Sequence, residues 1–201
     1  MSLITAAQVR EHFTALTGTG QDSLLDTMID RADALMAGWC GWPPSAGVYT
    51  MASASYTLYP APHTTYPEAL WHGLKWVTAV TTAHIDEDWD YGADDLVDAG
   101  DLVIDNDLGA LWLRPDSSWA WSASPRSNKV VLVNGFATTP DDLVAACAMQ
   151  TRALLDLARV QGVSQVSAGG QSFTRSDTDA ILLRSVKEAL QPYINWRSRA
   201  G

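Results

Sequence analysis

The chain has 201 residues, of which 47% are hydrophobic, and its formal net charge at pH 7 is −10. A chain of this length can bury roughly 70% of its unfolded surface, which is enough for one domain or for a domain that carries an insertion. Proteins that bind nucleic acid tightly concentrate Lys and Arg on one face, where these residues neutralise phosphate groups. The negative net charge therefore argues against tight binding of nucleic acid.

No run of residues approaches the roughly 18 apolar residues that a membrane span needs. The first residues, MSLITAAQVREH, lack the basic start and the continuous apolar stretch of a secretory signal. We therefore expect a folded protein that stays in the cytosol where it is made and has no membrane partner.

Two helices are predicted at the start of the chain. Thr5 is a suitable N-cap for the first helix, and Gly18 is a suitable stop. Asp22 can cap the second helix, which ends before Pro43. Apolar residues form a stripe along this second helix, and charged residues, among them Asp33, fall opposite that stripe. The spacing therefore predicts that Asp33 lies on the polar face.

From about Val48 the helical period gives way to β-rich runs separated by turn signals. We expect about four to six short strands in this part of the chain. The runs that suggest them are residues 49–59, 74–85, 101–104, 110–113 and 129–133.

The helical pattern returns at Thr139, which can act as N-cap with Pro140 at the first helical position. This helix is apolar on much of its circumference and is expected to be central to the fold or to an oligomer. Gly162 stops it, and Ser176 can start a last helix that Pro192 breaks.

Together these patterns predict an α+β fold that is mainly a helical bundle of about four helices, with a small antiparallel β module inserted into it. Residues 1–47 and 134–201 are expected to form the helical core. Residues 48–133 are expected to form the inserted module.

The sequence offers no catalytic motif, so we expect no catalytic residue, no cofactor and no enzymatic activity. Cys40 and Cys147 lie in apolar helical contexts without a CxxC or Cys/His cluster, which predicts buried thiols rather than a disulfide or a metal site. The acidic run 86–92 differs from a calcium loop because glycine falls at its seventh position and Val97 stands at the twelfth. A solvated surface turn is the favoured interpretation, so we expect no metal site.

The stretch from Ser167 to Trp196 is the most informative part of the sequence. A glycine-rich hinge leads there into a short amphipathic helix, a proline and an aromatic, basic tail. Trp, Tyr and Arg are the residues that most often carry interface energy, so the tail is predicted to dock on a partner. The alternative that Tyr193 and Trp196 fold back on the chain's own helices stays open. The candidate docking residues are Tyr193, Ile194, Trp196, Arg197 and Arg199, and the candidate hinge or inter-subunit loop contains Gly162, Gly169, Gly170 and Phe173.

In their order and spacing, four features resemble the head-tail connector (head completion adaptor) family of tailed bacteriophages. They are the helical pair from Leu3-Ile4-Thr5 to Gly41, the strand Val77–Val80 followed by Tyr91-Gly92, the strand Val130–Phe136 with the helix start Pro140–Leu143, and the hinge Gly162-Val163-Ser164 with a closing helix that ends Leu190-Gln191-Pro192-Tyr193. The middle of the chain departs from the family because it is unusually rich in Trp and acidic residues.

The resemblance implies a structural virion protein at the head-tail interface, assembled in the host cytoplasm. Such adaptors form a ring, generally a dodecamer, below the portal protein, where they extend the DNA channel and offer a docking platform. The implied partners are other copies of the chain, the portal protein, and a tail, stopper or terminator protein. DNA is expected to pass through the lumen without tight binding, because acidic subunits repel the phosphate backbone.

A second hypothesis comes from the nine tryptophans of the chain. A Trp-rich β module can form an aromatic platform that binds a small molecule or a glycan. The sequence of the module shows no set of convergent polar groups, which disfavours this alternative.

Overall fold

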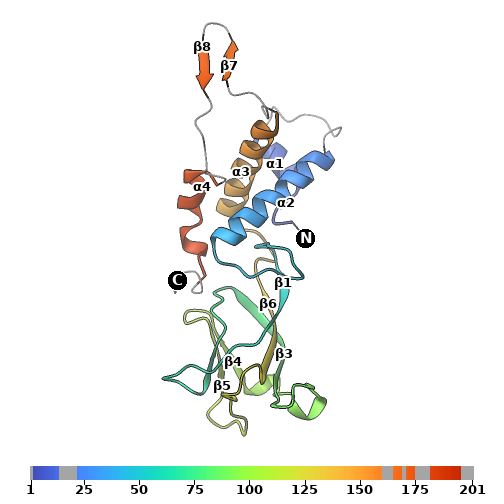
Figure 1. Ribbon diagram of the computed structural model, residues 1–201, viewed down its shortest axis with the longest axis vertical. Helices are drawn as coiled ribbons and strands as arrows, with labels where there is room; N and C mark the ends of the chain where they lie inside the picture. The colour runs from blue at the N-terminus through green and yellow to red at the C-terminus, as the bar shows by residue number, and fades with distance from the viewer. Residues whose placement is uncertain (1, 14–21, 160–164, 169–170, 175–181, 196–201) are drawn as a thin grey trace.

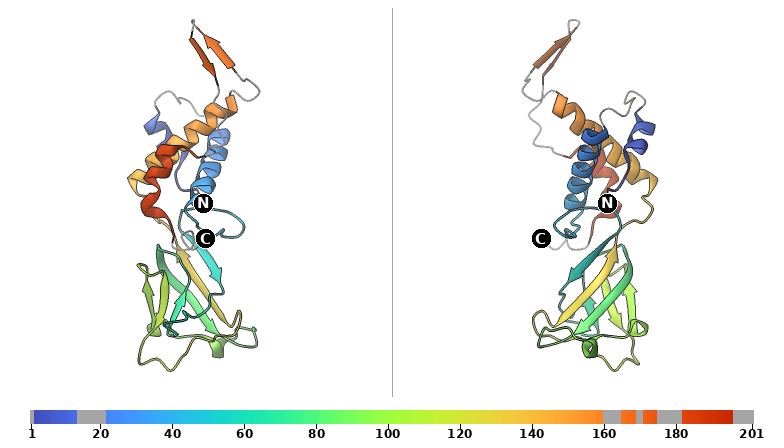
Figure 2. Two further views of the ribbon diagram at one scale, coloured as in Figure 1. Left: turned by 60° about the vertical axis from the view of Figure 1, so that its left-hand side comes forward. Right: turned by 90° about the vertical axis from the view of Figure 1, so that its right-hand side faces the viewer.

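The computed structural model describes residues 2–13, 22–159, 165–168, 171–174 and 182–195. The molecule is elongated, with its helices toward one end and its sheets toward the other (Figure 1). The chain starts in the helices, passes into the sheets after α2, and returns to the helices after β6. Figure 2 shows the same separation from two further directions.

The helical part of the described chain contains α1 (Ala6–His12), α2 (Asp22–Trp39), α3 (Asp141–Arg159) and α4 (Arg184–Ala189). A capping box starts α1, since Gln8 N–H donates to the Thr5 hydroxyl oxygen at 3.3 Å and Thr5 N–H donates to Gln8 Oε1 at 2.9 Å. Helix α3 is central because it contacts α1, α2 and α4. Its buried side chains share one apolar core with those of the other helices.

Two antiparallel sheets form the other end. One has the order β1-β6-β3, with β1 at Ala54–Leu58, β6 at Asn128–Asn134 and β3 at Val77–Ile85. The second has the order β2-β5-β4, with β2 at Ala69–Trp71, β5 at Ala110–Leu113 and β4 at Leu102–Asp105. Burial alternates along β6, as expected for a strand with one face on a core. The two sheets enclose a second apolar core.

Three short 3₁₀ helices and a hairpin complete the described structure. The 3₁₀ helices are η1 (Ala93–Asp95), η2 (Ala99–Asp101) and η3 (Gln191–Tyr193). Strands β7 (Gln165–Ala168) and β8 (Gln171–Thr174) pair with each other in antiparallel register. They extend beyond the helices, at the end opposite the two sheets (Figures 1 and 2).

The prediction of a mainly helical bundle is wrong, although the α+β class is consistent with the structure. Four α-helices accompany two three-stranded antiparallel sheets in the described chain. The first and the last helix are short, since α1 has seven residues and α4 has six. Strand β2 was missed because Ala69–Trp71 contains no β-branched residue. The division at residues 48 and 133 stays a prediction.

Several predicted helix boundaries also differ from the structure. Helix α1 ends at His12 with Phe13 as its C-cap, and the predicted stop at Gly18 lies outside the described residues. Helix α3 begins at Asp141, so Pro140 rather than Thr139 directly precedes it, and the Thr139 hydroxyl donates to the carbonyl oxygen of Leu3 at 2.6 Å. Ser176 also lies outside the described residues, and α4 begins at Arg184.

The prediction of buried thiols is confirmed, since Cys40 and Cys147 are free and buried. Burial raises the pKa of each thiol to about 12, which keeps both protonated at neutral pH. None of the helices in the described ranges combines the length and the apolar content that a bilayer span needs.

Asp33 is buried, in contrast to its predicted place on the polar face of α2, and its exposed fraction is only 2%. Its carboxylate accepts a hydrogen bond from the Thr50 hydroxyl at 2.5 Å and one from Met51 N–H at 2.9 Å. Burial raises the pKa of Asp33, and these hydrogen bonds oppose the shift. The carboxylate therefore ties α2 to the segment that leads into β1.

Replacing Asp33 with Ala removes the acceptor that serves Thr50 and Met51. We expect the Asp33→Ala variant to lose about 1–3 kcal/mol of unfolding free energy, because buried donors deprived of a partner carry a desolvation cost. Urea denaturation followed by circular dichroism measures the loss. Asp26→Ala, at an exposed position of the same helix, is the control and should change stability by less than about 0.5 kcal/mol. Equal effects in the two variants would contradict the tethering role of Asp33.

Candidate functional site

Four aromatic rings meet where the helices join the sheets, and we call them the aromatic joint. Trp42 follows α2, Trp76 precedes β3, Phe136 follows β6 and Tyr193 lies in η3. The centroid of the Phe136 ring lies 5.9 Å from that of Trp42, 5.1 Å from that of Trp76 and 5.6 Å from that of Tyr193. Tilted and edge-on rings at such spacings attract each other beyond the effect of buried area. The joint therefore connects four segments that are far apart in the sequence.

The C-terminal segment is anchored on this joint. The Tyr193 hydroxyl donates to the Asp142 carboxylate at 2.8 Å, and Trp42 Nε1–H donates to the Tyr193 carbonyl oxygen at 3.2 Å. Asn195 N–H donates to the Cys40 carbonyl oxygen at 2.9 Å, and Asn195 Oδ1 accepts from Lys75 N–H at 3.0 Å. The segment is thus bound to both the helices and the sheets.

The predicted docking residues fall into two groups. Tyr193 is buried against the chain's own helices, and Ile194 is half-buried against the helical core. Burial, followed by the hydrogen bond to Asp142, raises the pKa of Tyr193 to about 12. Trp196, Arg197 and Arg199 lie outside the described residues. Portal docking by this set stays a prediction.

The predicted hinge or inter-subunit loop overlaps the β7–β8 hairpin. Phe173 lies in β8, opposite Val166 of β7. Gly162, Gly169 and Gly170 lie outside the described residues. This hairpin was not predicted from the sequence. The sequence signal that could have indicated it is the Gly-Gly pair, because two glycines between short extended runs are typical of a β-hairpin.

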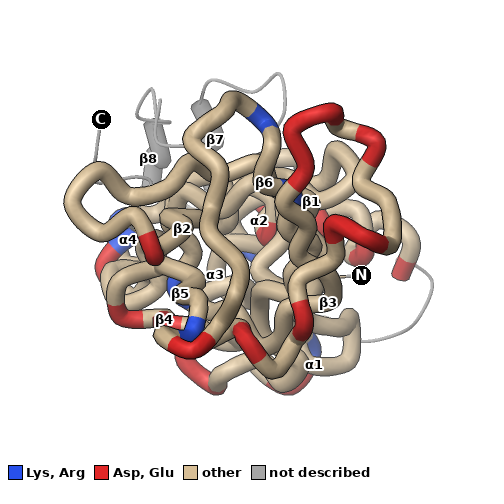
Figure 3. The backbone as a smooth tube through the Cα atoms, turned by 90° about the horizontal axis from the view of Figure 1, so that it is seen from below, with Lys and Arg blue, Asp and Glu red and all other residues tan. Residues whose placement is uncertain are grey.

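Nearly half of the acidic residues lie in one segment of the sheet end. Residues 86–116 contain eleven acidic residues and one basic residue, Arg114, so their net charge of −10 equals that of the whole chain. The remaining residues have no net charge, because they include twelve acidic and twelve basic side chains. Figure 3 looks at the sheet end and shows many acidic and few basic residues on the loops there. This end of the molecule repels polyanions.

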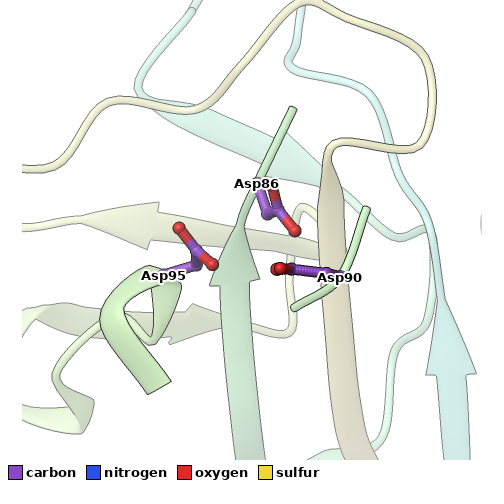
Figure 4. A group of neighbouring side chains, drawn as sticks. All are labelled: Asp86, Asp90 and Asp95. Carbon is purple, nitrogen blue, oxygen red and sulfur yellow. The ribbon is translucent and has the colours of Figure 1, made fainter. Parts of the chain in front are cut away.

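Three of these carboxylates, those of Asp86, Asp90 and Asp95, gather at the end of β3 (Figure 4). Each offers an oxygen within 4.8 Å of the others. Asp86 accepts from Tyr91 N–H at 2.7 Å, which is the main cause that lowers the pKa of its carboxyl group. Asp90 and Asp95 both accept from Gly92 N–H, at 3.3 and 3.2 Å. These bonds close the loop after β3 and hold the three carboxylates near one another.

Comparisons with known proteins identify solved structures that share the fold of this chain. No protein-family model matches the chain, and no curated protein matches it. A chain in the neck of an empty GTA particle, computed with C6 symmetry, is similar with a TM-score of 0.54 and 17% identity over 93% of this chain and 89% of that chain. A chain in the neck of a native GTA particle, computed with C12 symmetry, gives a TM-score of 0.52 and 16% identity over 91% of this chain and 86% of that chain.

The chain has the fold of these neck proteins. The similarity covers most of the sequence and so includes the helices and the sheets in one order. At this level of identity it does not transfer the role of any residue. The aromatic joint and the acidic segment must therefore be understood from this chain alone.

Removing the Tyr193 hydroxyl tests whether it serves the fold. We expect Tyr193→Phe to lose about 1 kcal/mol of unfolding free energy, because the hydrogen bond to Asp142 is lost while the ring stays in the joint. Tyr66→Phe is the control, since that side chain is 50% exposed. Chemical denaturation of both variants measures the difference. Unchanged stability in Tyr193→Phe would mean that the hydroxyl is free to serve a partner instead.

Proposed function

We propose that the protein is a head-tail connector (adaptor) that forms a ring below the portal of a tailed phage or phage-like particle. The observation that carries the proposal is the shared fold with chains in the necks of GTA particles, which are gene transfer agents and phage-like. Those necks were computed with C6 and C12 symmetry. A ring of this chain, with twelve copies as the expected number, follows from the analogy.

In this ring the subunits extend the DNA channel and offer a platform for a tail, stopper or terminator protein. The elongated subunit supports the proposal, because it separates one end for the portal from another end for the next component (Figure 1). Its role is structural, without catalysis. It acts in the virion at the head-tail interface after assembly in the host cytoplasm.

The charge distribution supports passage of DNA without tight binding. Residues 86–116 carry a net charge of −10, and the neighbouring Arg126 and Lys129, which lie beside Tyr91, offset only a small part of it. If the ring directs this segment at the lumen, the lumen repels phosphate groups and DNA slides instead of adhering.

Ring formation can be tested on the purified protein, alone and mixed with the portal protein encoded by the same genome. We expect closed rings by negative-stain electron microscopy and a twelve-copy mass by native mass spectrometry. The protein would not be a connector of this type if it stayed monomeric both alone and with the portal.

Exposed apolar residues on α3 give a sharper form of the same test. Met149 and Leu157 are 41% and 38% exposed, and they lie about two turns apart on α3. We expect Met149→Asp and Leu157→Asp to keep the wild-type melting temperature but to lose the ring, because a carboxylate in an apolar contact is costly. Val48→Asp, at a 60% exposed position outside the helices, should keep the ring.

Portal docking by the tail can be tested by truncation after Asn195. Asn195 itself must stay, because it is fully buried and bonded to Lys75 and Cys40. We expect deletion of residues 196–201 to leave the thermal melt almost unchanged and to weaken portal binding, since Trp196, Arg197 and Arg199 are removed. A pull-down with the portal protein measures the effect. If the truncated protein binds the portal as strongly as the wild type, the tail is dispensable for docking. If the truncated protein is unfolded, residues 196–201 belong to the core.

A further inference from the structure

A cavity of about 730 Å³ opens in the sheet end beside β2, β4 and β5. Its lining residues include Trp112, Trp119, Trp121, Glu68 and Arg114. The volume lies within the range of about 300–1,000 Å³ that is usual for small-ligand sites. We call it the tryptophan cavity.

The residues around the cavity are held in place by hydrogen bonds. Trp121 Nε1–H donates to the Glu68 carbonyl oxygen at 3.0 Å, which fixes the indole against the start of β2. The Ser117 hydroxyl donates to Asp101 Oδ2 at 2.9 Å and accepts from Trp119 N–H at 3.2 Å. The loop that carries Trp119 is therefore fastened on both sides. Because these residues are already held in place, little conformational entropy is lost when a ligand binds.

The polar groups of the cavity have unused hydrogen-bonding capacity. Glu68 and Arg114 are both exposed. Within the described residues, neither the Glu68 carboxylate nor the Arg114 guanidinium takes part in an ion pair. One group only accepts hydrogen bonds and the other only donates them. A fitting ligand must therefore offer both donors and acceptors next to an apolar face.

An aromatic surface continues from the cavity along β2. The Tyr66 ring lies 5.9 Å from that of Trp112 and 5.4 Å from that of His63, which in turn stacks on Trp71 at 5.3 Å. Tyr66 and Trp71 are 50% and 46% exposed. The surface offers room for a ligand longer than the cavity itself.

We propose that the tryptophan cavity binds a neutral oligosaccharide. The C–H face of a pyranose ring packs on an indole, and its hydroxyl groups both donate to a carboxylate and accept from a guanidinium. Polyanions are disfavoured because β4, β5 and Arg114 belong to the segment that carries the net charge of −10. The inference goes beyond the connector function, and its test needs no ring because the cavity is formed by a single chain.

A proline-rich peptide is the nearest competitor, because such peptides also dock on aromatic grooves. It fits this cavity less well. Proline has no N–H to donate to the Glu68 carboxylate. Trp121 Nε1–H, which could otherwise donate to a peptide carbonyl, already serves the Glu68 carbonyl oxygen.

Binding can be measured with the full chain on an array of neutral oligosaccharides that includes maltohexaose, cellohexaose and chitotetraose. Hits are then titrated by calorimetry and tryptophan emission. We expect at least one sugar to bind, with affinity reduced about tenfold or more in Trp119→Ala. Glu68→Gln keeps the shape of an exposed side chain and should also weaken binding. Trp89→Ala is the control, because Trp89 is 56% exposed and lies outside the cavity.

Several results would overturn the proposal. These are the absence of binding to every neutral sugar, and equal affinity in the wild type, Trp119→Ala and Glu68→Gln. Binding of a decaproline peptide that Trp119→Ala abolishes, without sugar binding, would assign the cavity to a peptide. Thermal melts show whether Trp119→Ala is folded, and Glu68→Gln gives an independent result if it is not.

Discussion

The two ends of the molecule depend on one close backbone contact, between Gly135 and Ala52. Gly135 has a φ of +116°, and a Cβ atom there would lie 2.5 Å from the Ala52 carbonyl oxygen. Only glycine allows this approach. It brings the returning chain against the outgoing chain, so that Phe136 N–H donates to the Met51 carbonyl oxygen at 3.1 Å and Gly135 N–H to that of Trp76 at the same distance. The aromatic joint can form only because these segments are paired.

Buried polar contacts then fix the joint from both sides. Asp33 holds the outgoing segment through Thr50 and Met51, and Asn195 connects Cys40 to Lys75. Partnered polar groups in a buried place specify one arrangement, because any displacement leaves a donor or acceptor unpaired. The helices and sheets are therefore connected by more than the two crossings of the chain. In a connector, such a joint would pass load between the portal side and the tail side.

Local signals in the sequence predicted the local structure, but not how distant segments meet. The N-cap at Thr5 and the strand at residues 110–113 depend on neighbours within a few positions, and both are confirmed. Asp33 was misplaced because its partners follow 17 and 18 residues later. The rings of the aromatic joint come from four separate segments, so no periodicity identifies them. The same is true of the tryptophan cavity, where Glu68 meets residues more than forty positions away in the sequence.

The separation of charge limits how a ring of this chain can be held together. Closing the ring brings like-charged segments of −10 into one assembly, and their repulsion is only partly screened, since the Debye length at physiological salt is about 8 Å. Attraction must then come mainly from elsewhere. Outside residues 86–116 the chain has no net charge, and α3 exposes Met149 and Leu157 there. In the proposed ring the helices therefore supply the cohesion, while the sheet end supplies the repulsion that keeps DNA mobile.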